Sequence, residues 1–240
     1  MKDKPTIVGL QKLTLLDYPD KMAAILFLPG CNMACPFCHN SELIHGQQSE
    51  IDYDEVMTFL KKRKNMLDGV VITGGEPTLQ DITPLLADIK ELGYYVKVDT
   101  NGSHPDHMYK WITNNLVDYI AMDIKNSPQK YEKTCGTKFV LPSTIDKAIV
   151  CLKHSPIQHE FRTTVTPSLH DIEDIATIGT WIGPTETLFI QPFVKRDTVP
   201  DQSLVEPDDA FLLHCVNAVK PYVKHVEIRG RDINPSILSN

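Results

Sequence analysis

Short apolar runs alternate with amphipathic segments along the whole chain, and this alternation constrains the fold most. Runs rich in β-branched or aromatic residues predict strands at residues 21–28, 70–73, 94–98, 119–122, 160–165, 187–191 and 223–228. Segments of helical period predict helices at residues 52–63, 80–92, 106–115, 128–133, 143–153, 171–181 and 207–219. Strands that alternate with helices form βαβ units around a parallel sheet. Because six strands lead into helical crossovers, we expect an α/β fold with a partial (β/α)6 TIM-type barrel.

No linker, repeat or low-complexity segment interrupts the alternation, so we expect residues 1–240 to form a single domain. Within it, the segment from about 196 to 240 is the least diagnostic of function. The hydrophobic content of 42% and the charged content of 23% are ordinary for a globular protein.

Three further features bear on location and partners. The net charge of −7 argues against a nucleic-acid partner. No apolar run approaches the ~18 residues of a membrane span, and the charged residues 1–5 do not fit a signal peptide. We therefore expect a cytoplasmic protein that binds neither membrane nor nucleic acid.

Polar clusters follow several predicted strands at their C-terminal ends. They are the cysteine loop of residues 29–40, the turn 74–77, the segment 99–102 and the segment 123–125. In parallel barrels the C-terminal face of the sheet carries the chemistry. We therefore expect these clusters to converge on one rim.

The cysteine loop holds three of the six cysteines in the spacing Cys-x3-Cys-x2-Cys, at Cys31, Cys35 and Cys38. In a reducing cytoplasm such thiols are more typical of metal ligands than of disulfides. The remaining cysteines are scattered through helical or loop segments and are expected to serve packing; they are Cys135, Cys151 and Cys215.

Four kinds of site fit the loop to different degrees. The order Cys35-x-x-Cys38-His39 matches a c-type haem attachment pattern, and Cys35 with Cys38 matches a redox pair, but both leave Cys31 unused. Zinc could use the three cysteines and His39, although adjacent Cys38 and His39 would have difficulty reaching one tetrahedral ion. The fourth kind is an iron–sulfur cluster with three thiolate ligands and one open iron.

The loop also carries an aromatic residue, Phe37, directly before its last cysteine. With that residue it resembles the signature of the radical S-adenosylmethionine (radical SAM) enzymes, and residues 29–40 closely resemble the glycyl-radical-enzyme activases. Residues 74–77 resemble the motif that ends the second strand of this family. Residues 9–13 and 16–19 are similar to the branch that activates anaerobic ribonucleoside-triphosphate reductases. The resemblance covers about residues 5–195.

This resemblance implies a radical SAM fold, one [4Fe-4S] cluster held by Cys31, Cys35 and Cys38, and SAM bound at the open iron. In this family, reductive cleavage of SAM gives a 5′-deoxyadenosyl radical that abstracts a hydrogen from a glycine Cα. The implied protein substrate is an anaerobic ribonucleotide reductase, and the implied electron donor is a flavodoxin or ferredoxin. No side chain is expected to act as catalytic acid or base.

Three other functions stay open. One is the activase of another glycyl radical enzyme, of the pyruvate formate-lyase type. Another is a radical SAM enzyme that acts on a small molecule. The third is a zinc or scaffold protein without redox chemistry.

The resemblance also implies how SAM is bound. The end of the strand at Gly74 and Gly75 would bind its methionine amino group, and Glu76 would fix the turn or assist that contact. Asp123 and Lys125 would contact the methionine end. The remaining residues of the predicted cofactor-binding set that belong to the cysteine loop are Phe37, Cys38 and His39.

Two further expectations concern charged groups in the same region. A monovalent cation would be held near Asp99, Thr100 and Asp123, because such ions prefer hard oxygen ligands. Arg162 could pair with the carboxylate of SAM in a bidentate way.

One segment departs from the family pattern. The pyruvate formate-lyase activases carry a histidine after a Leu-Pro-Tyr segment, whereas residues 191–194 here read Gln-Pro-Phe-Val. Gln191 is therefore only a candidate contact for SAM. We also expect residues 17–18 and 229–231 to flank the opening of the barrel and contact the partner.

Overall fold

The computed structural model describes residues 4–44 and 48–233, and a single sheet forms its centre. The eight strands follow one another in chain order across the sheet. They are β1 (Gly9–Thr14), β2 (Ala23–Leu28), β3 (Gly69–Gly74), β4 (Tyr95–Thr100), β5 (Tyr119–Asp123), β6 (Gln158–Val165), β7 (Thr185–Pro192) and β8 (Val223–Ile228). Strands β2 to β8 pair in parallel, and β1 pairs antiparallel with β2.

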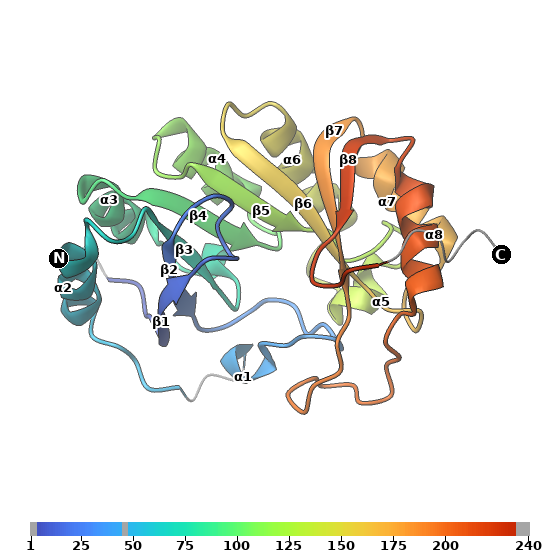
Figure 1. Cartoon of the computed structure of the whole chain (residues 1–240), viewed down its shortest axis with the longest axis horizontal. Helices are drawn as coiled ribbons and strands as arrows, with labels where there is room; N and C mark the ends of the chain where they lie inside the picture. The colour runs from blue at the N-terminus through green and yellow to red at the C-terminus, as the bar shows by residue number, and fades with distance from the viewer. Residues whose placement is uncertain (1–3, 45–47, 234–240) are drawn as a thin grey trace.

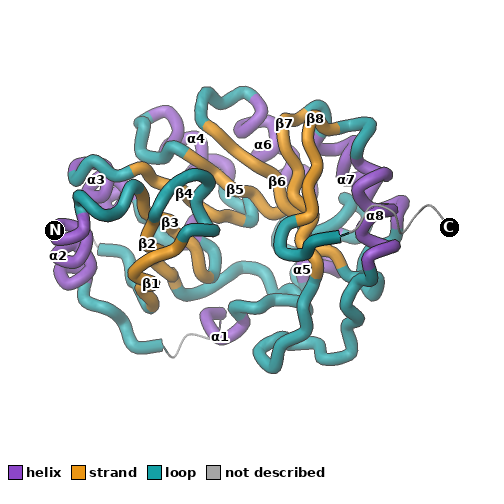
Figure 2. Tube along the Cα trace, in the orientation of Figure 1, coloured by secondary structure: helices purple, strands orange, loops and turns teal. Residues whose placement is uncertain are grey.

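The described residues form nine helices, most of which cover the outer face of the curved sheet (Figure 1; Figure 2). They are α1 (Ser41–Ile44), α2 (Tyr53–Arg63), the 3-10 helix η1 (Pro77–Leu79), α3 (Thr83–Glu91), α4 (Pro105–Thr113), α5 (Tyr131–Cys135), α6 (Pro142–Lys153), α7 (Ile172–Ile182) and α8 (Asp209–Val219). Each connection between neighbouring parallel strands contains at least one of them, which confirms the predicted α/β fold with six crossovers. Among the described residues, no helix has the length and apolar character needed to cross a bilayer.

The sheet does not close into a full barrel. Among the described residues, β1 and β8 are the two edges and do not pair with each other. Figure 1 shows them on either side of the front of the molecule, with β1 in blue and β8 in red. The strands predicted from the sequence begin at residue 21, so β1 was not among them. The sequence did not predict β1 because backbone pairing with β2 holds this strand in place, and no local residue pattern indicates that pairing.

Successive residues of each strand face opposite sides of the sheet. The larger core, between the sheet and the helices, includes Leu26, Ile72 and Phe161. A smaller cluster lies on the inner face of the sheet near the amino ends of the strands; it comprises Tyr18, Ala23, Ile25, Val71, Tyr119 and Ala121. This apolar floor leaves the inner space available toward the carboxyl ends. Of the predicted domain, residues 1–3, 45–47 and 234–240 lie outside the described residues.

Candidate active site

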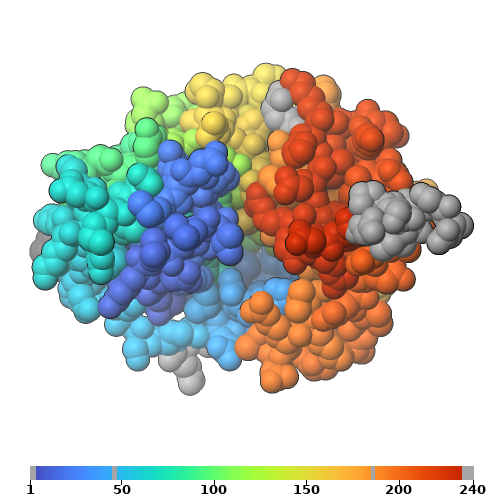
Figure 3. Space-filling model, in the orientation of Figure 1, coloured from blue at the N-terminus to red at the C-terminus, as the bar shows by residue number. Residues whose placement is uncertain are grey.

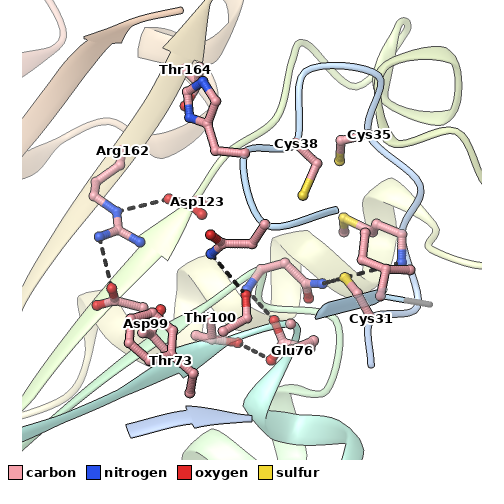
Figure 4. A pocket seen from close by; sticks show the side chains of 18 of the residues that line it. Cys31, Cys35, Cys38, Thr73, Glu76, Asp99, Thr100, Asp123, Arg162 and Thr164 are labelled. Atoms are coloured by element: carbon pink, nitrogen blue, oxygen red, sulfur yellow. Dashed lines mark hydrogen bonds and ion pairs between the residues drawn. The ribbon is translucent and has the colours of Figure 1, made fainter. Parts of the chain in front are cut away.

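The carboxyl ends of the strands surround a cavity of about 450 Å³ (Figure 4). The predicted site residues that line it are Cys31, Cys35, Phe37, Cys38, His39, Gly74, Gly75, Glu76, Asp99, Thr100, Asp123, Lys125 and Arg162. The candidate Gln191 lines it as well. The structure therefore brings the whole predicted set to one place.

The cysteine loop forms one wall of this cavity, and Figure 4 shows Cys31, Cys35 and Cys38 together on that side. The backbone N–H of Met33 donates to the sulfur of Cys31 over 3.4 Å. Burial raises the pKa of Cys31 to about 11 and also raises the pKa of Cys38. Binding a metal to these thiols would therefore release protons.

The donor set fits an iron–sulfur cluster, because three cysteine thiols line one cavity and such clusters take cysteine thiolates as ligands. Within residues 4–44 and 48–233, no three His, Cys, Asp or Glu side chains are grouped closely enough to hold one metal ion. The three thiols nevertheless line one cavity. Iron–sulfur clusters bind one cysteine thiolate per iron, so their ligands lie farther apart than the ligands of a single zinc ion.

The turn after β3 holds the beginning of the cysteine loop. The N–H of Glu76 donates to the carbonyl of Gly30 over 2.7 Å, and the N–H of Gly75 donates to the carbonyl of Leu28 over 2.8 Å. A Cβ atom on Gly75 would lie 1.7 Å from the Gly30 oxygen. We expected these glycines to admit a ligand, but at Gly75 the close approach is to the backbone of the cysteine loop.

Glu76 joins the ends of β3 and β4. Its side chain is buried and accepts hydrogen bonds from the Thr78 N–H and hydroxyl, from the Thr100 hydroxyl over 2.6 Å and from the Asn101 N–H over 2.7 Å. Burial raises the pKa of Glu76, and these donors act against that rise. Both carboxylate oxygens are used within the protein, so the contacts support a role for Glu76 in fixing the turn.

Ion pairs form the opposite wall of the cavity (Figure 4). Arg162 donates from Nε to Asp123 over 2.8 Å and from a terminal nitrogen to Asp99 over 3.2 Å. Lys125 lies 3.0 Å from Asp123, and Lys97 pairs with Asp99. Burial alone would raise the pKa of Asp123, but Arg162 and Lys125 outweigh it and lower that pKa to about 2.

This wall changes two expectations. Arg162 already pairs with two carboxylates, so it would have to leave one of them to bind the carboxylate of SAM in a bidentate way. A monovalent cation at Asp99 and Asp123 would compete with Arg162 for the same oxygens. Thr100, the third residue expected near that cation, already uses its hydroxyl to donate to Glu76.

The segment after β7 supports the cysteine loop from outside. The ring nitrogen Nε2 of His39 lies 2.7 Å from the Val194 carbonyl, which can only accept, so His39 is the donor. The His39 ring also stacks on Phe193 at a centroid distance of 5.9 Å. The N–H of Asp201 donates to the Pro36 carbonyl over 3.0 Å. At the segment where the resemblance predicts a histidine that contacts SAM, Phe193 and Val194 instead contact His39 and hold the cysteine loop in place.

Comparison with known proteins agrees with this geometry. A model described as the radical SAM superfamily matches residues 25–178, which includes the cysteine loop and most of the sheet. The chain belongs to the radical SAM superfamily.

Two relatives within the radical SAM superfamily indicate which type of enzyme this chain is. A Methanocaldococcus jannaschii protein that carries the provisional name glycyl-radical enzyme activating enzyme is 33% identical over 233 residues, which is 94% of this chain and 96% of that protein. A Staphylococcus aureus pyruvate formate-lyase-activating enzyme is 27% identical over 170 residues, 68% of this chain and 58% of that enzyme. The chain is thus an enzyme of the glycyl-radical-enzyme activase type.

Solved structures show the same fold. Streptococcus suis SuiB bound to the precursor peptide SuiA superposes with a TM-score of 0.69 at 15% identity, over 86% of this chain and 48% of SuiB. Membership in the radical SAM superfamily implies an iron–sulfur cluster and SAM as cofactors, and the thiols of the cavity fit that cluster.

Several polar residues that line the cavity of this radical SAM protein were not among the predicted cofactor-binding residues; they are Gln11, Asn40, Thr73, Asn101 and Thr164. Asp17, which was expected to flank the opening, lines the cavity as well. Asn101 could have been found, because it follows Thr100 in a polar cluster at the end of β4. Gln11 and Asp17 reach the cavity only because β1 folds against β2. Tyr18, expected to contact a partner, is 2% exposed and packs beside Tyr119, so that expectation is wrong.

Proposed function

We propose that this enzyme activates an anaerobic ribonucleoside-triphosphate reductase by installing a glycyl radical. The observation that carries the proposal is a cavity lined by three thiols inside an unclosed sheet. In Figure 3 the surface is recessed between the N-terminal residues in blue and the C-terminal residues in red. A peptide loop of a partner protein needs such an open side to reach the cavity.

Each group of cavity residues has a task in this proposal. Cys31, Cys35 and Cys38 would hold the irons of one [4Fe-4S] cluster and leave one iron open for SAM. With an electron from a flavodoxin or ferredoxin, the bound cluster and SAM would supply a 5′-deoxyadenosyl radical that removes a hydrogen from a glycine Cα. The protein positions the reactants and excludes water, so no side chain is required as acid or base.

The remaining residues would bind and orient SAM. Gly74 and Gly75 shape the turn beside the thiols, and Lys125 supplies an ammonium group for the methionine carboxylate. Lys125, with Lys97 and Arg162, already balances the two carboxylates Asp99 and Asp123. We therefore propose that Arg162 occupies the place where the resemblance implied a monovalent cation.

The name of the Staphylococcus aureus relative favours a second candidate, an activase for a pyruvate formate-lyase. To separate the two, the reduced protein and SAM are incubated with either enzyme, and the glycyl doublet is recorded by electron paramagnetic resonance. We expect the doublet with the reductase and not with the lyase. A doublet with the lyase alone would select the second candidate. Formation of 5′-deoxyadenosine with no doublet in either mixture would point to a small-molecule substrate.

A further inference from the structure

Asn101 directly follows β4 and is buried at the wall of the cavity. Its backbone N–H donates to Oε2 of Glu76 over 2.7 Å, which fixes its main chain at the end of the sheet. Its side-chain oxygen Oδ1 accepts from the N–H of Ser103 over 2.9 Å. A backbone N–H can only donate, so the oxygen of the Asn101 amide must face Ser103 and the nitrogen must lie on the other side.

That nitrogen, Nδ2 of Asn101, reaches the cysteine loop. It donates to Oδ1 of Asn32 over 3.0 Å and to the sulfur of Cys31 over 3.9 Å. An amide nitrogen carries two hydrogens, so one is available for each of these acceptors. The side chain of Asn32 is held in turn, because it donates to the hydroxyl of Ser103 over 2.9 Å. Asn101 therefore connects the end of β4 to the first thiol of the loop.

The sulfur of Cys31 thus accepts from two N–H groups that belong to different parts of the chain. Met33, which donates over 3.4 Å, lies in the same loop as Cys31. Asn101 is instead anchored to the sheet through Glu76. A cysteine that binds iron is a thiolate, and hydrogen bonds to a charged acceptor are stronger than those to a neutral one. The donor from Asn101 is therefore placed to act on the iron-bound form of Cys31.

We propose that Asn101 is a positioning residue that donates a hydrogen bond to the Cys31 thiolate and thereby raises the reduction potential of the bound cluster. Reduction adds negative charge to the cluster and its sulfur ligands, so a donor to one sulfur stabilises the reduced form more than the oxidised form. The proposal rests on the proposed function, because it needs the cluster at the three cysteines.

The test compares the anaerobically reconstituted full-length protein with three variants: Asn101→Ala, Asn101→Asp and Asn126→Ala. Aspartate keeps an oxygen for the Ser103 N–H but has no N–H to donate to Cys31. Asn126 is also buried and its side-chain nitrogen donates two hydrogen bonds, but it is not among the residues that line the cavity. Its loss therefore controls for the removal of a buried, hydrogen-bonded amide. Iron content is measured, and the midpoint potential of the cluster is determined by redox titration followed by electron paramagnetic resonance.

We expect a more negative midpoint potential for both Asn101 variants, at iron contents close to that of the wild-type protein. The shift should be larger for Asn101→Asp, because a carboxylate beside the sulfur also adds negative charge. Asn126→Ala should keep the wild-type potential.

Three results would overturn the proposal. One is an unchanged potential in Asn101→Ala with full iron content, and another is an equal shift in Asn126→Ala. The third is loss of iron from both Asn101 variants while Asn126→Ala retains it, because Asn101 would then be needed to assemble the site and not to set its potential. Failure of the proposed function looks different, because the wild-type protein would then bind no cluster at all.

Discussion

At the scale of single residues, the missing side chain of Gly75 decides how closely the turn after β3 approaches the cysteine loop. Its missing side chain leaves room for the Gly30 carbonyl, to which the neighbouring N–H of Glu76 donates. The pair Gly74-Gly75 could be predicted from the sequence as a strand-end turn. Its true contact could not, because that contact joins residues 45 positions apart through the pairing of β2 with β3.

We predict that Gly75→Ala destabilises the protein by about 3 kcal/mol, because the added methyl group would overlap the Gly30 oxygen. It should also lower the iron content, since the cysteine loop must shift. Urea unfolding and iron analysis measure the two effects. Gly230→Ala is the control: Gly230 has φ +92°, but a Cβ atom there would meet nothing within 4 Å, so only the cost of its backbone conformation, about 1 kcal/mol, should remain. Equal losses in both variants would contradict the steric explanation.

At the scale of elements, the segment after β7 contacts the cysteine loop, although the two are far apart in the sequence. Phe193 and Val194 contact His39, and the hydroxyl of Thr198 donates to the His39 carbonyl over 3.2 Å. The strand itself was predicted from its apolar residues. The contacts of the following segment with the cysteine loop were not predicted, because a backbone carbonyl can accept a hydrogen bond whatever residue carries it.

We predict that His39→Ala still binds the cluster but releases iron to a chelator several-fold faster than the wild-type protein. The lost hydrogen bond and ring contact should each contribute about 1 kcal/mol to holding the loop. The rate of iron release under anaerobic conditions measures the effect. His214→Ala, at an exposed position on α8, serves as the control. Release at the wild-type rate from His39→Ala would show that the segment after β7 does not support the loop.

At the scale of the whole molecule, an ion pair between a partly exposed arginine and a buried glutamate joins the C-terminal strand to the inner face of the sheet. Arg229, just after β8, makes two hydrogen bonds of 2.7 and 3.0 Å to Glu160 on β6 and lies 3.5 Å from the centre of the Phe189 ring. Glu160 is fully buried and also accepts from the Tyr119 hydroxyl. Strand order and crossovers could be predicted from the alternation, but this pairing across two strands could not, since it depends on the curvature of the sheet.

We predict that Arg229→Gln destabilises the protein by about 3 kcal/mol, because it leaves the Glu160 carboxylate buried without its cation. The double variant Arg229→Gln with Glu160→Gln should recover a large part of this loss, since the uncompensated charge is removed. Denaturant unfolding of the single variants and the double variant gives the coupling between the two residues. Additive losses would contradict a direct interaction.

The central claim is that three thiols of one loop hold the cluster and leave one iron open for SAM. Its most direct test measures 5′-deoxyadenosine formed from SAM by the dithionite-reduced, anaerobically reconstituted protein and by single alanine variants of four cysteines. We predict product from the wild-type protein and from Cys135→Ala, and none from Cys31→Ala, Cys35→Ala or Cys38→Ala. A colourless wild-type protein that binds zinc, or a Cys135→Ala protein without a cluster, would contradict the claim.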